Sequence, residues 1–278
     1  MGKEFKTVSV GNFELGGNEP LFFLGPCVIE SELFIREIGP RIRQIADAAG
    51  VNFVFKASYD KANRSSVDSF RGMGCEPGCR LLREMGKELG VPVTTDIHTA
   101  AEAEIAGEFI DVLQIPAFLC RQTDLLEAAA KTGRVVNVKK GQFLAPWDVK
   151  NIADKLDAFG CEHYFITERG TSFGYNNLVA DMRSIPWIQE DGLRVVFDAT
   201  HSVQRPGGEG SSSGGDGKFA PVLARSAVAA GCDGIFMETH PNPAEALSDG
   251  PNQVPLDKLG GVLSQLKSLY HLVRQQPE

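Results

Sequence analysis

The sequence predicts a single (β/α)₈ barrel, an α/β fold of the TIM-barrel type, with a short N-terminal β-hairpin. Eight short apolar runs rich in β-branched residues alternate with amphipathic segments along the 278 residues. Continuous apolar runs are typical of parallel strands buried on both faces, because crossover helices cover the sheet. Eight strand–helix units in about 250 residues match the size of a closed barrel. A doubly wound open sheet is the alternative, since periodicity does not show whether a sheet closes.

The elements follow in a regular order. The opening VSVGNFELG predicts the hairpin, which we assign to residues 1–19. Several amphipathic segments, among them 33–50 and 78–90, end in glycine, the expected residue after a helix. No linker or change of composition separates a second domain, so we expect residues 1–278 to form one catalytic domain. The predicted strands lie in LFFLGP, VNFVFKAS, VPVTTDI, VLQIPA, RVVNVKK, HYFITER, LRVVFDAT and GIFMETH.

Charge and hydropathy exclude some classes of function. The net charge is −8, whereas general nucleic-acid or membrane binding needs a basic face. The N-terminal residues carry no apolar signal core, and no apolar run approaches the roughly 18 residues of a membrane span. We therefore expect a soluble cytoplasmic protein that binds neither nucleic acid nor membranes.

The six cysteines are scattered along the chain and do not form the framework of a disulfide-rich protein. Cys75 and Cys79 are too far apart for a CxxC redox pair. For most of the six we expect the role of a small buried apolar residue. Cys27 differs, because it follows Gly-Pro at the end of the first apolar run, in the stretch GPCVIES.

The stretch RPGGEGSSSGGDGK at residues 205–218 cannot bury a core, so we expect a flexible loop. It follows the seventh predicted strand, a position that favours a lid over the active site. A tolerated surface insertion is the alternative.

A polar side chain that could take part in catalysis or binding lies at the end of every predicted strand. Chemistry in a barrel enzyme lies at the carboxyl ends of the strands, so these groups are expected to share one mouth. The groups are Cys27, Lys56, Ser58, Asp96, His98, Gln114, Lys139, Lys140, Glu168, Arg169, Asp198, His201, Glu238 and His240.

Two groups of cations in this mouth predict two anion sites. Lys56, Lys139 and Arg169 suit a phosphate together with a carboxylate. Lys61 and Arg64 follow the second strand in the short loop DKANRSS, with two hydroxyl groups beside them. Two anion sites at one mouth indicate two phosphorylated or carboxylated substrates, and hence a condensation.

A second set of side chains could bind a divalent metal. Cys27, His201, Glu238 and Asp249 supply thiolate, imidazole and carboxylate groups, with His240 as a spare. Mixed ligands with open positions suit Lewis-acid chemistry. None of them shares the local spacing of a known metal motif, so the residues alone leave metal binding and packing both open.

Many collinear motifs resemble one enzyme family, the 3-deoxy-D-manno-octulosonate 8-phosphate synthases, from about residue 20 to residue 270. The resemblance implies a (β/α)₈ barrel assembled as a homotetramer. It also implies condensation of phosphoenolpyruvate with D-arabinose 5-phosphate and water, giving the octulosonate phosphate and inorganic phosphate on the pathway to lipopolysaccharide Kdo. The motifs are GPCVIES, FKASYDKANRSS, RGMGCEPG, TDIHTA, LQIPAFLCRQTDLL, NVKKGQF, TERGTSFGYNNLVADMR, DATHSVQ and METHPNP.

The resemblance also assigns residues to the two substrates. The closely similar heptulosonate synthases, which use erythrose 4-phosphate, carry a KPRTS-like stretch in place of KANRSS, so the loop favours the five-carbon sugar. We expect Lys61 and His201 to assist proton transfer, and Asp96 to be the third catalytic residue. The implied sugar-phosphate site is Lys61, Asn63, Arg64 and Ser65, and the implied phosphoenolpyruvate site is Lys56, Ser58, Gln114, Ala117, Lys139, Arg169 and His201.

The family divides into metal-dependent and metal-independent members. This chain resembles the dependent type at Cys27, where the other type carries asparagine. The resemblance then implies His201, Glu238 and Asp249 as the other ligands. Such a set is compatible with Zn²⁺, Fe²⁺, Mn²⁺ or Co²⁺.

Two alternatives remain at the level of sequence. A Schiff-base aldolase would use one strand-end lysine as a nucleophile, although the grouping of three cations argues against it. A non-catalytic sugar-phosphate-binding protein would bind the same ligands and release no phosphate.

Overall fold

In the computed structural model, which describes residues 5–64, 66–207 and 214–275, eight parallel strands close into a barrel. β11 (Val195–Asp198) pairs on one side with β8 (Tyr164–Glu168) and on the other with β14 (Gly234–His240). Because β14 also pairs with β3 (Leu21–Gly25), the ring has no free edge. The predicted (β/α)₈ barrel is therefore confirmed, and the open sheet is excluded. The barrel strands are β3 (Leu21–Gly25), β4 (Asn52–Lys56), β5 (Val93–Asp96), β6 (Val112–Ile115), β7 (Val135–Lys139), β8 (Tyr164–Glu168), β11 (Val195–Asp198) and β14 (Gly234–His240).

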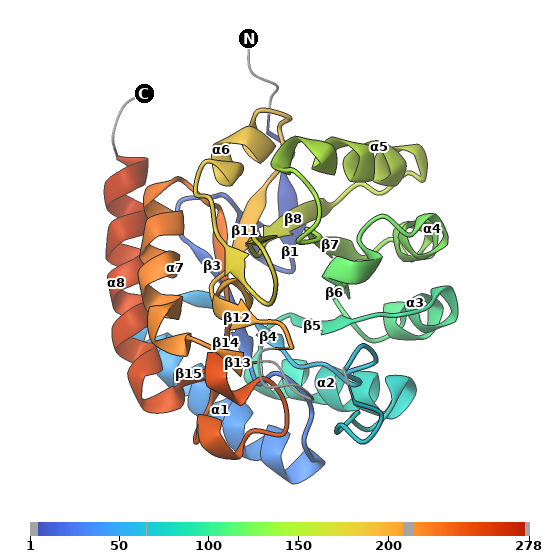
Figure 1. The fold of residues 1–278 in the computed structure, drawn as a ribbon. Coiled ribbons are helices and arrows are strands. Elements are labelled where there is room, and N and C mark those ends of the chain that lie inside the picture. The colour runs from blue at the N-terminus through green and yellow to red at the C-terminus, as the bar shows by residue number, and fades with distance from the viewer. Residues whose placement is uncertain (1–4, 65, 208–213, 276–278) are drawn as a thin grey trace.

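One α-helix follows each barrel strand, and Figure 1 shows these helices arranged around the barrel. Among the described helices, none is long and apolar enough to cross a membrane. The helices are α1 (Glu32–Ala49), α2 (Cys75–Leu89), α3 (Ala100–Gly107), α4 (Thr123–Lys131), α5 (Lys150–Ala158), α6 (Ser184–Gln189), α7 (Ala220–Ala229) and α8 (Leu256–Arg274).

Local sequence explains where the helices begin and end. Ser31 caps α1 by accepting a hydrogen bond from the Phe34 amide, and the chain leaves that helix at Gly50 with φ 64°. In α3, Thr99 and Glu102 form a reciprocal capping box. Each cap satisfies backbone groups that have no partner within the helix.

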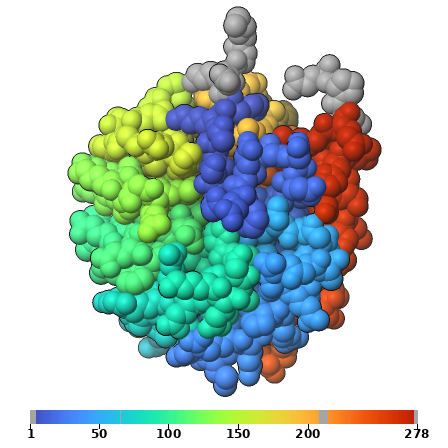
Figure 2. Space-filling model, turned by 180° about the vertical axis from the view of Figure 1, so that it is seen from behind, coloured from blue at the N-terminus to red at the C-terminus, as the bar shows by residue number. Residues whose placement is uncertain are grey.

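The N-terminal hairpin of β1 (Val8–Val10) and β2 (Phe13–Leu15) covers the amino-terminal end of the barrel. Val8, Val10 and Leu15 pack into the same apolar cluster as the barrel-lining side chains Phe23 and Phe165. Figure 2, seen from behind, shows the dark blue N-terminal segment lying over the upper middle of that face. The predicted hairpin is present, and it closes the end opposite the strands' carboxyl ends.

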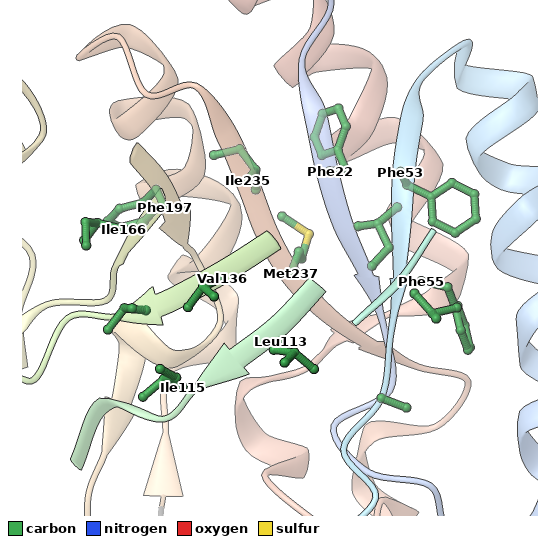
Figure 3. Packing of buried hydrophobic residues seen from close by; sticks show 14 of the residues in the cluster. Phe22, Phe53, Phe55, Leu113, Ile115, Val136, Ile166, Phe197, Ile235 and Met237 are labelled. Carbon is green, nitrogen blue, oxygen red and sulfur yellow. The ribbon is translucent and has the colours of Figure 1, made fainter. Parts of the chain in front are cut away.

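Side chains of most barrel strands alternate between two apolar clusters, because successive residues point to opposite faces. Phe22, Phe53 and Val136 face outward and pack in the larger cluster with the helices, as Figure 3 shows. Val135 and Phe165 face inward and fill the lower barrel with the hairpin. Among the described residues, the barrel interior is filled at its amino-terminal end and opens at its carboxyl-terminal end.

Shorter strands and 3₁₀ turns lie in the loops at the carboxyl-terminal end of the barrel. β9 (Thr171–Ser172) pairs with β10 (Leu178–Val179), β12 (Gln204–Arg205) pairs with β13 (Gly214–Gly215), and β15 (Val254–Pro255) extends the sheet beside β14. The 3₁₀ turns are η1 (Ala117–Leu119), η2 (Pro146–Val149), η3 (His201–Val203), η4 (Gly217–Phe219), η5 (Pro243–Glu245) and η6 (Gly250–Asn252).

Candidate active site

A polar cavity opens at the carboxyl ends of the barrel strands. Parallel strands bring their ends to one edge, so residues far apart in sequence meet there. The cavity is lined by Lys56, Asp60, Lys61, Asn63, Arg64, Asp96, His98, Pro116, Ala117, Phe118, Lys139, Gln142, Arg169, His201, Gln204, Pro206, Gly207, Glu238 and Asp249.

The three cations predicted for phosphoenolpyruvate all reach this cavity. Two of them are already paired with buried carboxylates: the Lys56 amine lies 2.6 Å from Glu238 Oε1, and the Lys139 amine lies 2.6 Å from Asp198 Oδ2. Arg169 donates to Gln204 Oε1 at 2.9 Å. The pairing fixes the lysine amines in place and keeps the buried charges compensated.

The predicted sugar-phosphate residues that the structure describes reach the same cavity. Lys61, Asn63 and Arg64 line it, whereas the predicted Ser65 lies outside the described residues. Arg64 donates to Ser248 Oγ at 2.9 Å and lies 3.1 Å from Asp249 Oδ1. Arg64 thus joins the KANRSS loop to the loop that carries a predicted metal ligand.

The four predicted metal ligands converge beside these cations. Ligand atoms of Cys27, Glu238 and Asp249 all lie within 4.8 Å of one another. His201 Nε2 faces the same point, 3.7 Å from Glu238 Oε2 and 3.9 Å from Asp249 Oδ2. Glu238 Oε2 is buried and has no hydrogen-bond partner among the described residues. A buried carboxylate oxygen without a partner is costly, so the four groups fit a bound divalent cation.

Asp198 orients the His201 ring. Its Oδ2 atom lies 2.8 Å from His201 Nδ1, which directs Nε2 toward Glu238 and Asp249. Such a carboxylate–histidine contact typically fixes the tautomer of a metal-binding histidine. Although burial opposes ionisation, His201 and Lys139 hold the pKa of Asp198 well below its usual range.

The charge states of the other candidate ligands follow from their neighbours. Burial and the Glu238 carboxylate raise the pKa of the Cys27 thiol to about 12, so the free thiol is protonated at neutral pH. A cation would have to displace that proton, as metal ions do at thiol ligands. Burial raises the pKa of Glu238, but Lys56 and His201 outweigh it and lower the pKa overall.

Two predicted phosphoenolpyruvate residues lie beneath the cavity rather than in its wall. Ser58 and Gln114 are fully buried, and both bond to Asp96, which does line the cavity. Ala117 lines the cavity at the start of η1. The predicted catalytic residues Lys61, Asp96 and His201 are therefore all in the cavity wall.

Three strand-end groups turn away from the predicted metal group. His240 Nε2 lies 3.4 Å from Glu30 Oε1, outside the ligand cluster of the described residues. Lys140 and Glu168 lie 3.6 Å apart and do not line the cavity. Lys140 points to the opposite face from Lys139 because neighbouring strand residues alternate.

Comparison with known proteins identifies the family. A model of the DAHP synthetase I family matches residues 5–275. The chain belongs to this family. It is 55% identical over 271 residues to a 2-dehydro-3-deoxyphosphooctonate aldolase of Geobacter sp. (strain M21), covering 97% of this chain and 99% of the relative.

Other relatives carry the same name. The 2-dehydro-3-deoxyphosphooctonate aldolase of Cyanothece sp. (strain PCC 7425) is 56% identical over 259 residues, or 93% of this chain and 95% of that protein. The one from Francisella tularensis subsp. holarctica (strain LVS) is 53% identical over 272 residues, or 98% and 99%. This member of the DAHP synthetase I family thus matches such aldolases along nearly its whole length.

Sequence reasoning placed Asp198 at a strand end but gave it no role, and it missed Gln204 and Ser248. In this DAHP synthetase I family member Ser248 is buried and accepts a hydrogen bond from the Cys27 thiol at 3.2 Å. The spacing Asp198-x-x-His201 was a usable signal, because the chain turns directly after β11 and returns the histidine to the carboxylate. Gln204 and Ser248 left no such signal.

The predicted lid is described only at its two flanks. β12 and β13 pair there, and Pro206 and Gly207 line the cavity. Residues 208–213 lie outside the described residues, so the lid stays a prediction.

Proposed function

We propose that this chain condenses phosphoenolpyruvate with D-arabinose 5-phosphate and water, releasing inorganic phosphate, in the biosynthesis of lipopolysaccharide Kdo. Its relatives named 2-dehydro-3-deoxyphosphooctonate aldolase, at more than half identity, support this reaction. The observation that carries the proposal is the presence of two groups of cations in one cavity: Lys56, Lys139 and Arg169 at or just after strand ends, and Lys61 and Arg64 in the KANRSS loop.

The first group binds phosphoenolpyruvate in this proposal. Lys139 and Arg169 present their charges to the phosphate and carboxylate groups, with the arginine supplying two parallel donors. Arg64 holds the phosphate of the sugar and Lys61 lies toward its aldehyde, so that the aldehyde faces the C3 carbon. Holding the two reactants in the correct orientation lowers the activation barrier by several kcal/mol, out of the roughly 7–11 kcal/mol that orientation can contribute.

The bonds change as follows. C3 of phosphoenolpyruvate forms the new C–C bond with the aldehyde carbon, and the aldehyde oxygen takes a proton. Water adds at C2, the C–O bond to phosphate breaks, and a ketone remains as inorganic phosphate leaves. Lys61 suits the proton donor because its amine stays protonated at neutral pH: burial lowers its pKa, but the carboxylates of Glu238 and Asp96 outweigh burial and raise the pKa overall.

We also propose that the enzyme is of the metal-dependent type. Cys27, His201, Glu238 and Asp249 would hold the ion, and their mutual distances support this. A divalent cation there supplies Lewis-acid polarisation of the aldehyde oxygen or of a water molecule. Asp198 keeps His201 Nε2 directed toward the ligand group.

The reaction is tested by phosphate release from phosphoenolpyruvate with either arabinose 5-phosphate or erythrose 4-phosphate. We expect turnover with the five-carbon sugar and little with the four-carbon sugar. Lys139→Met should abolish turnover, whereas Lys150→Met, which removes an exposed amine paired with Asp154, should not. Preference for erythrose 4-phosphate would assign the chain the heptulosonate reaction instead.

The metal type is tested by metal content. Cys27→Asn should lower the amount of zinc, iron, manganese or cobalt bound per chain after purification, and Cys232→Ala should leave it unchanged. Both cysteines are buried, but only Cys27 has carboxylates converging on it. Equal metal content in the two variants contradicts the assignment.

We propose that the chain assembles as a homotetramer in the cytoplasm. Large aromatic side chains remain exposed on the loops that follow β6 to β8, and such patches typically mark interfaces. We expect light scattering to give four times the 30.1 kDa mass of one chain. Replacing Phe143 and Phe173 with serine should lower that mass, and an unchanged mass would place the interface elsewhere. The exposed aromatic residues are Phe118, Phe143, Phe173 and Tyr175.

A further inference from the structure

A chain of hydrogen bonds crosses the barrel interior directly beneath the cavity. Thr167 Oγ1 on β8 donates to Asn137 Oδ1 on β7 at 2.7 Å, and Asn137 Nδ2 donates to Gln114 Oε1 on β6 at 2.9 Å. Gln114 Nε2 then donates to Asp96 Oδ1 at the end of β5, at 2.6 Å. Four neighbouring strands are thus joined side chain to side chain, and the chain of bonds ends at a carboxylate in the cavity wall.

The other oxygen of Asp96 is held from the opposite side. Ser58 Oγ donates to Asp96 Oδ2, and the Lys61 amine donates to Ser58 Oγ at 3.0 Å. Although burial opposes ionisation, Lys61, Lys56 and Lys139 hold the pKa of Asp96 far below its usual range. Asp96 therefore stays a carboxylate at neutral pH.

The charge on Asp96 dictates the direction of every bond in the chain. A carboxylate only accepts, so Gln114 must turn its NH₂ group toward Asp96 and its carbonyl toward Asn137. Asn137 must then donate with its NH₂ group, which leaves its carbonyl facing Thr167. The Thr167 hydroxyl is the last donor, and any reversed amide would bring two acceptors together.

Asn137 and Thr167 are fully buried and do not line the cavity. Two residues earlier on the same inward face, β7 and β8 carry Val135 and Phe165. A buried polar side chain costs free energy unless it is hydrogen-bonded, and these side chains bond chiefly to each other and to Gln114. Packing alone would therefore be served by apolar residues at both positions.

We propose that Thr167 and Asn137 are positioning residues for the condensation, which hold the Gln114 amide and through it the Asp96 carboxylate at the floor of the cavity. This inference rests on the proposed function. Asp96 lies near cations of both substrate groups: the Ser58 hydroxyl that donates to Asp96 accepts from Lys61. Lys56 and Lys139 line the same cavity as Asp96. A rotated carboxylate would disturb both substrates at the point where they meet.

A matched pair at Thr167 separates the hydroxyl from packing. Thr167→Val keeps the shape and removes the last donor, whereas Thr167→Ser keeps the donor and removes a buried methyl group. We expect the valine variant to lose about tenfold in kcat, less than the roughly hundredfold cost of a full ångström of misplacement. The serine variant should retain kcat, although it melts at a lower temperature than the wild type.

Thr94→Val is the control. Thr94 is equally buried on β5, but its hydroxyl donates to the backbone carbonyl of Val112 and takes no part in the chain. Asn137→Asp should lower kcat further than Thr167→Val, because an oxygen would then face the Gln114 carbonyl. The valine variant at 167 keeps the test decisive if the aspartate variant does not fold.

Each outcome has one meaning. A low kcat in Thr167→Val, with near wild-type kcat in Thr167→Ser and Thr94→Val, supports positioning through the hydroxyl. Wild-type kcat in Thr167→Val, or an equal loss in Thr167→Ser, overturns it. Absence of phosphate release by the wild-type protein refutes the proposed function itself, and that result is distinct from any difference among the variants.

Discussion

The two halves of the barrel interior are lined by the same strands but by opposite kinds of side chain. On β7, Val135 packs against the N-terminal hairpin cluster, Asn137 lies in the hydrogen-bonded layer, and Lys139 reaches the cavity. All three face inward, since strand side chains alternate. Within five residues one strand passes from an apolar side chain in the core, through a hydrogen-bonded amide, to a lysine in the cavity wall.

The difference shows where stability and chemistry reside. The amino-terminal half is filled mainly by apolar side chains, whose removal from water stabilises the fold. The carboxyl-terminal half buries lysines and carboxylates, which at best compensate the cost of losing their hydration. Changes in the lower half should therefore alter stability, and changes in the upper half should alter turnover.

The largest expected effect is on stability in the lower half. Phe165→Ala removes a fully buried ring that lies 5.3 Å from the Phe23 ring, and it should lower the free energy of unfolding by about 3–5 kcal/mol. The kcat of the folded fraction should stay near that of the wild type. Denaturant unfolding measures the first quantity, with Leu272→Ala as the control because that side chain is exposed. A large loss of kcat would contradict the proposal that the lower half of the barrel determines stability and the upper half determines turnover.

Asp198→Asn, a substitution in the carboxyl-terminal half of the barrel, should reduce turnover. Asparagine keeps the size of the side chain but removes the charge that pairs with Lys139 and His201. We expect turnover to fall about 100-fold, the upper range for the loss of a carboxylate that supports a metal-binding histidine. Steady-state kinetics and metal content report the change. Unaltered turnover would show that the orientation of His201 does not matter.

Arg64→Met should separate the two substrates. We expect the KM for arabinose 5-phosphate to rise about tenfold, equivalent to ~1.4 kcal/mol, with a far smaller change for phosphoenolpyruvate. Arg64 lies in the same loop as Lys61, and its contacts are Ser248 and Asp249. Initial rates with each substrate varied in turn test this. Equal changes in both constants would defeat the assignment of the loop.

The smallest expected effect is the pH dependence of stability. The folded-state pKa values of Asp96, Asp198 and Glu238 lie below their usual range, so the folded state binds fewer protons than the unfolded chain. Their stabilising effect is present above the unfolded pKa values near 4 and is lost as the pH falls below them.

Thermal unfolding between pH 7 and pH 3 measures this loss. The melting temperature should stay nearly constant down to about pH 5 and then decline. Asp198→Asn should show a shallower decline than Phe165→Ala, which keeps every carboxylate. A steeper decline in Asp198→Asn would contradict the proposal that the low pKa of Asp198 makes the folded state less stable at acidic pH.

The barrel was predictable from sequence because the strands are apolar runs and several helices between them, such as α1, α2, α4 and α5, have an amphipathic pattern. All eight predicted runs contain a barrel strand. The pairs β9–β10 and β12–β13 were not predicted, because strands of two residues carry no periodic pattern. Closure came only from the structure, through the β11–β14 pairing.

The sequence predicted which residues lie in the site, but not which of them form ion pairs with one another. Strand ends identified Lys56 and Lys139, whereas their carboxylate partners lie 182 and 59 residues further along the chain. No local pattern specifies which of several strand-end carboxylates a lysine will meet. Asn137 and Thr167 could have been found by stepping back two residues from Lys139 and Arg169, since inward-facing positions alternate.

The most direct test of the proposed reaction is phosphate release from phosphoenolpyruvate and arabinose 5-phosphate, before and after treatment with a chelator. We expect activity in the untreated protein, its loss with the chelator, and its return on addition of Mn²⁺, Co²⁺, Fe²⁺ or Zn²⁺. That result would support both the condensation and the role of Cys27 in binding the ion. Full activity after removal of all bound metal would contradict the metal-dependent reaction, and absence of phosphate release under every condition would contradict the condensation itself.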